Sequence, residues 1–360
     1  MNRRDIEEAR LAGILDDTKA AELEAFLKNR EAPGVSSDEE SLRFLSNFND
    51  IFISIGLVIL SIGMMIASGS FFGSSGSALL VLGPILVCLW FLLEYFARRR
   101  RLVLPSMVLS VIFTLVFTLL TALLANGLGS LENAEIAFDQ GFLDAYNKTK
   151  GVALWSAGGA AIGAGLIFAR FRLPFSLFLI AIAIAAGLYT EAFTNGNVSS
   201  IYSGGASLMI GLATLAIAIV FDARDPERKT LSSDNAFWLH LAAAPQIMLG
   251  LRALMSGGTY SGVSFGEAIP LLIALALFSI LSLALNRRAL IAAGLLSFWV
   301  SINAITDGAT SGATQIAVPL LLLGGGIVLL GAGWKTARRI VLAFMPTSGI
   351  FARIFPPEPA

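Results

Sequence analysis

Ten apolar stretches dominate the chain from residue 50 onward, and each is long enough to cross a lipid bilayer. They cover residues 50–69, 77–97, 102–126, 151–169, 173–193, 201–221, 235–256, 266–285, 289–306 and 313–333. About twenty helical residues, rising about 1.5 Å each, span the roughly 30 Å of hydrocarbon. Because lipid offers no hydrogen-bond partners, backbone groups must be satisfied within each segment, which predicts helices. We therefore expect an all-α, polytopic integral membrane protein with about ten transmembrane helices.

The amino-acid composition supports this class. Charged residues make up 14% of the 360 positions and apolar residues 56%, whereas an ordinary soluble domain has about 25% charged residues. The formal net charge is zero, so no nucleic acid is expected as a partner. The expected partner of most of the chain is the lipid bilayer.

The distribution of lysine and arginine predicts the orientation. If the spans alternate in direction, 22 of the 25 Lys and Arg residues fall on one side. The positive-inside rule assigns that side to the cytoplasm, so both termini are cytoplasmic, as an even number of spans requires. The Ala-, Gly- and Leu-rich composition is typical of bacteria, which predicts a multi-pass protein of the cell (inner) membrane. The basic residues that follow the spans are Arg98–Arg101, Arg170, Arg172, Arg224, Arg228, Lys229, Arg287, Arg288, Lys335, Arg338, Arg339 and Arg353.

The remaining sequence suggests four segments. Near the N-terminus a helical pattern ends at Gly13, and Asp16 or Asp17 can cap a second helix with Ala20 and Leu23 on its apolar stripe. The predicted segments are a cytoplasmic helical hairpin at 1–33, a linker at 34–49, a ten-helix transmembrane domain at 50–334, and a cytoplasmic interfacial helix with a tail at 335–360. A hairpin this small is expected to dock a protein partner, because it buries too little surface to fold well alone.

Small residues occur at positions that affect helix packing. Gly159 and Gly163 have GxxxG spacing, which lets two helices approach closely. Gly324, Gly325 and Gly326 either pack closely in the same way or interrupt their helix to line a site, as in transporters. Three cytoplasmic turns also look alike, and they read FARRRRLVLPSM, FARFRLPFSL and LNRRALIAAG.

Several further stretches together resemble a known family. They are AGILDDTKAAELEAFL, SLRFLSNFNDIFISIG, DARDPERKTLSSDNAFWLHLAAAP and GWKTARRIVLAFMP. The chain resembles an uncharacterised family of bacterial predicted integral membrane proteins, which have an N-terminal helical hairpin before multiple membrane spans. The resemblance implies a membrane location and implies no activity.

Ionisable residues within the spans are the candidates for a functional site, because each is costly to place in lipid. Glu94 lies four residues before Arg98 and is explained by an ion pair between them. On the outer side, one cation and three carboxylates share a depth. Either each extends separately to the interface, or they form a cluster around a cavity that binds a proton or an anion. These residues are Arg252, Glu191, Glu267 and Asp307.

His240, the one histidine, has two interpretations. Its neighbours one turn away are Ala236, Ala243 and Ala244, so it faces a closely packed surface. It either makes a hydrogen bond between helices or carries a proton, since imidazole titrates near neutral pH.

These observations leave three hypotheses about function. The leading one is a transporter-like small-solute permease, with proton coupling as an option. The alternative is a membrane scaffold or sensor that docks a protein partner through the N-terminal hairpin. A membrane enzyme is not favoured, because the sequence has no G-x-S-x-G, Walker or Rossmann pattern. With one histidine and one cysteine it also predicts no metal site and no cofactor.

Overall fold

The structure is a computed structural model that describes most of the chain. The described residues are 6, 10, 12, 16, 18–20, 22–23, 48–72, 78–125, 152–194, 200–226, 228, 230–255, 265–306, 312–345 and 355. The chain divides into two compact units, Met1–Ser41 and Leu42–Ala360.

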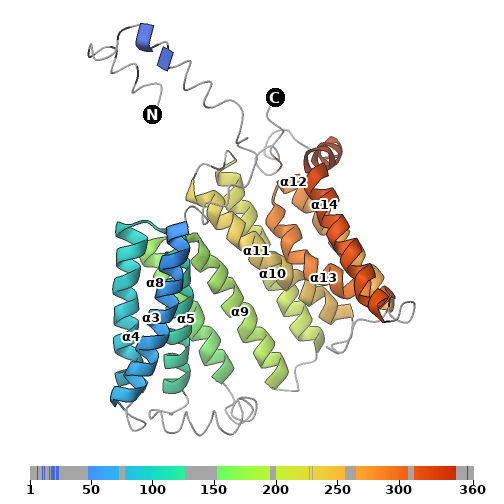
Figure 1. Ribbon diagram of the computed structural model, residues 1–360. Coiled ribbons are helices and arrows are strands. Elements are labelled where there is room, and N and C mark those ends of the chain that lie inside the picture. Colours follow the sequence, from blue (N-terminus) through green and yellow to red (C-terminus); the bar gives the residue numbers. More distant parts are fainter. Residues whose placement is uncertain are drawn as a thin grey trace. The chain divides into compact units, whose positions relative to one another are not determined.

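The described part of the second unit is built from helices, with no strand (Figure 1). Each predicted apolar stretch coincides with a helix to within a few residues, except at the end of the last one. The helices are α3 (Phe48–Phe72), α4 (Ala78–Leu93) with the π-helix η1 (Glu94–Arg99), α5 (Val103–Ala125), α8 (Val152–Phe171), α9 (Pro174–Thr194), α10 (Ser200–Arg224), α11 (Leu231–Met255), α12 (Phe265–Leu285), α13 (Arg288–Thr306) and α14 (Ala313–Ala343).

Seven helices in the described residues are long and apolar enough to cross a membrane. They are α3, α4 with η1, α5, α8, α10, α12 and α14. The chain is therefore a multi-pass membrane protein, and its described part is all-helical. The prediction that α9, α11 and α13 also cross, which makes ten spans, stays a prediction.

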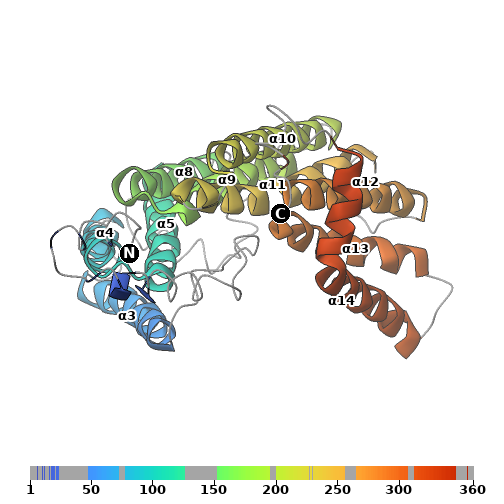
Figure 2. The same cartoon turned by 90° about the horizontal axis from the view of Figure 1, so that it is seen from above.

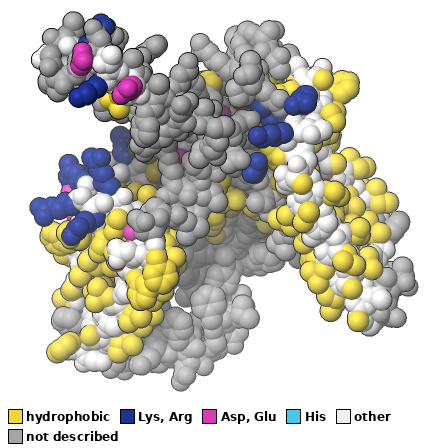
Figure 3. Space-filling view, turned by 45° about the horizontal axis from the view of Figure 1, so that its top comes forward, with side chains coloured by type: hydrophobic (Ala, Val, Ile, Leu, Met, Phe, Trp, Pro, Cys, Tyr) yellow, Lys and Arg dark blue, Asp and Glu magenta, His cyan; other side chains and the backbone are white. Residues whose placement is uncertain are grey.

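Lysine and arginine side chains gather at one end of these helices (Figure 3). This end holds the α4–α5, α8–α9, α10–α11 and α12–α13 connections, because consecutive helices run in opposite directions (Figure 1). We call it the basic end. Its assignment to the cytoplasm rests on the positive-inside rule and stays a prediction.

The predicted close packing at Gly159 and Gly163 is confirmed. A side chain at Gly159 would overlap the hydroxyl of Thr121 on α5, and one at Gly163 would lie 3.2 Å from the Phe117 ring. The α5 and α8 backbones can approach this closely because neither glycine carries a Cβ. Next to this contact, α3, α4 and α5 enclose an apolar core that includes Leu89.

Helix α14 differs from both expectations for its glycines. It is continuous from Ala313 to Ala343 through Gly324–Gly326, so these glycines do not interrupt it. A Cβ at any of the three would meet nothing within 4 Å, so the predicted close packing does not occur within the described part of the chain. Residues 335–343, predicted as the start of a separate interfacial helix, are the last turns of this same helix.

The first unit is described at a few positions. Ile6 and Ala20 are buried, the Ala20 amide donates to the Asp16 carbonyl at 2.8 Å, and the Thr18 hydroxyl donates to the Asp16 carboxylate at 3.0 Å. These contacts agree with a helix that begins after Asp16. The rest of the predicted hairpin and linker lies outside the described residues, so their boundaries stay predictions.

The α5–α8 contact yields a test with a matched control. Gly159→Ala is expected to lower the free energy of unfolding by about 1–3 kcal/mol, because overpacking forces the neighbouring side chain and backbone to shift. Gly158→Ala is the control, since a Cβ there meets nothing within 4 Å, and alanine favours the helix over glycine by up to about 1 kcal/mol. Thermal unfolding in detergent measures both variants. Equal stability of the two would show that the helices are not in close contact at Gly159.

Candidate functional site

A buried ion pair joins the end of α10 to the connection between α12 and α13. Asp222 and Arg287 are 8% and 2% exposed. The Arg287 Nε donates to Asp222 Oδ1 at 3.0 Å, and its terminal nitrogen Nη2 also contacts Oδ1. The planar guanidinium therefore binds one carboxylate through two of its nitrogens, a geometry that lysine cannot reproduce.

Ser233, in the first turn of α11, completes the shell of Arg287. The Arg287 Nη2 donates to the Ser233 hydroxyl at 3.0 Å. Ser233 is itself buried. A buried charge is tolerated when both its opposite charge and its hydrogen bonds are supplied, and here α10 supplies the carboxylate and α11 the hydroxyl. We call Asp222, Ser233, His240 and Arg287 the Asp222 cluster.

His240 lies at the apolar edge of this cluster and is fully buried. Its Nδ1 is 2.7 Å from the Ala236 carbonyl, and because a carbonyl only accepts, Nδ1 is assigned the proton. Its Nε2 lies 3.6 Å from Asp222 Oδ2, which is too long for a hydrogen bond, and it has no hydrogen-bond partner among the described residues. The predicted close packing around His240 is confirmed, since Ala236, Ala243 and Ala244 are all fully buried.

Asn286 shapes the turn that carries Arg287. Its φ is 53°, and the Arg287 amide donates to the Ser282 carbonyl at 2.9 Å, which is the pattern of a helix ended by a left-handed residue. Asparagine adopts this conformation more readily than other residues with a Cβ. The backbone conformation of Asn286 thus matches a common way of ending a helix.

Two long side chains hold this turn from outside. Arg228 donates to the carbonyls of Leu285 and Asn286 at 3.0 and 2.9 Å, so it satisfies carbonyls that the end of α12 leaves open. The indole Nε1 of Trp334, on α14, donates to Asn286 Oδ1 at 2.9 Å. Four helices and the α10–α11 connection therefore meet at the Asp222 cluster and the Asn286 turn.

Apolar packing closes the site on the membrane side. A buried group from α10, α11, α12 and α13 lies next to it and includes Leu215, Ile247 and Leu290. Helices α10 and α11 lie side by side (Figures 1 and 2), and a Cβ at Gly211 would come within 2.8 Å of the Ile247 amide nitrogen. The buried apolar group beside the cluster lowers the local dielectric, which strengthens the electrostatic interactions inside it.

The structure does not test the predicted outer cluster as a whole. Arg252 lies in the last turn of α11 and Glu267 in the first turn of α12, and both are half-buried. Glu191 lies in α9, but its side chain and the whole of Asp307 are outside the described residues. The pairing of Arg252 with these carboxylates stays a prediction.

Glu94 confirms one predicted ion pair and adds another. Its Oε1 accepts from Arg98 at 2.8 Å, as the spacing predicts, and also from Arg170 of α8 at 2.8 Å. These side chains are partly exposed, so they resemble ordinary interface ion pairs of small energy.

Sequence reasoning missed Asp222, Ser233, Arg287 and Asn286. Arg287 is one of the basic residues that follow the spans, and Asp222 likewise lies where an apolar stretch ends, so both resemble ordinary loop charges. One available signal was Asn286, since an asparagine directly after an apolar run is typical of a left-handed helix end. Another was His240, which needs a polar partner when it is buried.

The cluster combines a carboxylate, a guanidinium and an imidazole in a buried site. Among the described residues, no group of three or more His, Cys, Asp or Glu side chains could hold a metal ion. Within the cluster, the His240 Nε2 is the ring nitrogen without a hydrogen-bond partner among the described residues, and it lies 3.6 Å from the Asp222 carboxylate.

Comparison of the chain with models of protein families and with curated protein sequences found no match.

The buried pair predicts strong energetic coupling. Arg287→Gln is expected to lower the free energy of unfolding by roughly 3–5 kcal/mol, because it leaves Asp222 buried without its counter-ion. Adding Asp222→Asn should recover part of that loss. A double-mutant cycle from thermal unfolding in detergent measures the coupling.

The pair of Glu94 and Arg98 is the control for this cycle. Because the Arg98 side chain is 60% exposed, Arg98→Gln should change stability by less than about 1 kcal/mol. Coupling between Asp222 and Arg287 no larger than that between Glu94 and Arg98 would show that the cluster is not closed.

Proposed function

We propose that the protein is a transporter-like membrane protein for small solutes, in which the Asp222 cluster is a proton-responsive gate at the basic end. The observation that carries this proposal is the fully buried His240, whose Nε2 faces Asp222 without a hydrogen bond. An ionisable residue buried in a membrane protein is by default a candidate for function, because its cost must be offset.

Protonation of His240 would change the partners of Asp222. The Nδ1 already donates to Ala236, so the added proton would sit on Nε2 and point at the carboxylate 3.6 Å away. The imidazolium would then compete with Arg287 for Asp222 and would place a second positive charge beside the guanidinium. Both effects loosen the attachment of the α12–α13 turn to α10, which is the motion expected of a gate.

The location and the number of spans belong to the same proposal. We place the basic end in the cytoplasm of a bacterial cell, with the protein in the inner membrane, on the strength of the lysine and arginine distribution. We also propose that α9, α11 and α13 cross the membrane, because each lies between helices that do. The resemblance to uncharacterised bacterial membrane proteins is consistent with this placement.

A second candidate is a scaffold or sensor that docks a protein partner. It is favoured by the separation of Met1–Ser41 as a compact unit of its own. Loss of a co-purifying protein after deletion of residues 1–33, with thermal stability of the remainder unchanged, would support this candidate over the permease.

Proton movement in proteoliposomes tests the permease. The full-length protein is reconstituted with a pH-sensitive dye inside the vesicles, and amino acids, monosaccharides and carboxylic acids are added in turn. At least one solute is expected to drive proton entry. His240→Gln, which cannot carry the proton, should reduce that entry by at least about tenfold, as for loss of a proton-transfer group.

Arg98→Gln is the matched control, because it removes a charge at the same end without touching the cluster, and its proton entry should equal that of the wild type. If no solute in the panel moves protons, proton-coupled transport is excluded for that panel. If His240→Gln remains as active as the wild type, the proposed role of His240 fails.

A further inference from the structure

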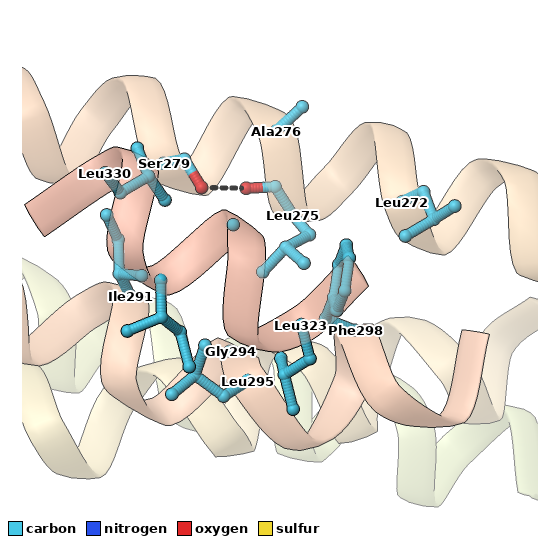
Figure 4. A pocket seen from close by; sticks show the side chains of 12 residues that line it. Leu272, Leu275, Ala276, Ser279, Ile291, Gly294, Leu295, Phe298, Leu323 and Leu330 are labelled. Carbon is cyan, nitrogen blue, oxygen red and sulfur yellow. Dashed lines mark hydrogen bonds between the residues drawn. The ribbon is translucent and has the colours of Figure 1, made fainter. Parts of the chain in front are cut away.

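A cavity of about 360 Å³ lies between α12, α13 and α14 (Figure 4). Aliphatic side chains and Phe298 form its walls. Among the described lining residues, Ser279 has the one polar side chain, and its hydroxyl already donates to the Leu275 carbonyl at 2.9 Å. The cavity therefore offers a polar solute at most the acceptor lone pairs of this one hydroxyl, and its apolar walls suit a hydrocarbon chain.

The cavity is a groove with an open side. Gly294 lies buried at its base, whereas Ala276 and Ile327 on its rim are exposed. Gly326 forms part of the wall, and a Cβ there would meet nothing within 4 Å. Exposed side chains of a membrane-spanning helix face acyl chains, so a lipid can enter this groove from its open side.

Basic residues lie just beyond the groove on the same helices. Arg288 precedes the lining residue Ile291 by three residues, and Lys335 follows Leu330 by five, which places them about 4.5 and 7.5 Å further along the helix axes. Both side chains are exposed. The Arg288 guanidinium lies over the ring of Trp334, 5.2 Å from its centre, and tryptophan is typical of the membrane interface.

The charge balance here calls for an anion. Residues 283–290 and 334–345 contain no aspartate or glutamate, and the Arg287 guanidinium is held by Asp222 of α10. Basic sites between transmembrane helices at the cytoplasmic side are where anionic phospholipid headgroups bind. The charge is thus complementary to a phosphate at the headgroup level.

We propose that this groove is a binding site for an anionic phospholipid of the leaflet at the basic end. One acyl chain occupies the cavity and the phosphate contacts Arg288 and Lys335. The site is separate from the Asp222 cluster, although Trp334 contacts both the groove region and the Asn286 turn: the Nε1–H at its ring edge donates to Asn286, and Arg288 lies over its ring face.

Filling the groove tests the acyl-chain part of the proposal. The full-length protein in detergent is titrated with phosphatidylglycerol or phosphatidylcholine, and native mass spectrometry counts the bound lipid. Gly326→Leu is expected to reduce phosphatidylglycerol binding at least tenfold. Gly325→Leu is the matched control, because it adds the same side chain to equally open space one residue away, outside the lining, and should bind as the wild type does.

Removing the basic residues tests the headgroup part. The wild type should prefer phosphatidylglycerol to phosphatidylcholine, and Arg288→Gln and Lys335→Gln should each reduce this preference about fivefold. Thermal unfolding checks that every variant is folded, and Ser279→Phe, which fills the groove from α12, replaces Gly326→Leu if that variant does not fold.

Three outcomes would overturn the proposal. They are equal binding of the two lipids by the wild type, equal loss of lipid in Gly325→Leu and Gly326→Leu, and a wild-type dimer that dissociates in Gly326→Leu while lipid binding is unchanged. The last result would assign the groove to a second copy of the chain.

Discussion

Arg287 keeps its charge at any physiological pH, yet it is 2% exposed in a protein surrounded by lipid. Such a charge is stable only where a carboxylate and further hydrogen-bond acceptors surround it. Asp222 from α10 and Ser233 from α11 meet this requirement. The pair therefore fixes how the ends of α10, α11 and α12 and the start of α13 are placed, and the role proposed for His240 depends on it.

The positive φ of Asn286 also occurs in other turns at the basic end, where the surroundings differ. Within the described residues, the non-glycine residues with positive φ are Arg101, Arg172, Arg228 and Asn286, and three of these lie in the turns whose sequences look alike. Arg101 and Arg172 are exposed, whereas Asn286 is buried. The turn at Asn286 is thus buried because Arg228 and Trp334 contact it, and not because of its backbone conformation.

The sequence predicted the helices because hydrophobic length alone defines a membrane segment, and it predicted the glycine contact at Gly159 from spacing. It could not identify the Asp222 cluster, because burial of Arg287 depends on which helix ends meet, and that is decided by packing between helices distant in sequence. The expectations for Gly324–Gly326 were wrong for a related reason. Small residues show that another helix could approach closely, but they do not show whether any helix does. Arg252 and the outer carboxylates were grouped because they lie at the same depth in the membrane. Residues at the same depth need not be in contact.

Hydrogen exchange of the backbone amides in lipid nanodiscs tests the central claim most directly, because it reports local opening turn by turn. The comparison is between residues 284–290, which include the buried turn, and residues 100–103, whose Arg100, Arg101 and Val103 are exposed. The account predicts that the amides of 284–290 exchange at least about tenfold more slowly, and that Asp222→Asn removes the difference. Equally fast exchange in the two segments of the wild type would contradict it, because the α12–α13 turn would then not be held closed by Asp222, Arg228 and Trp334.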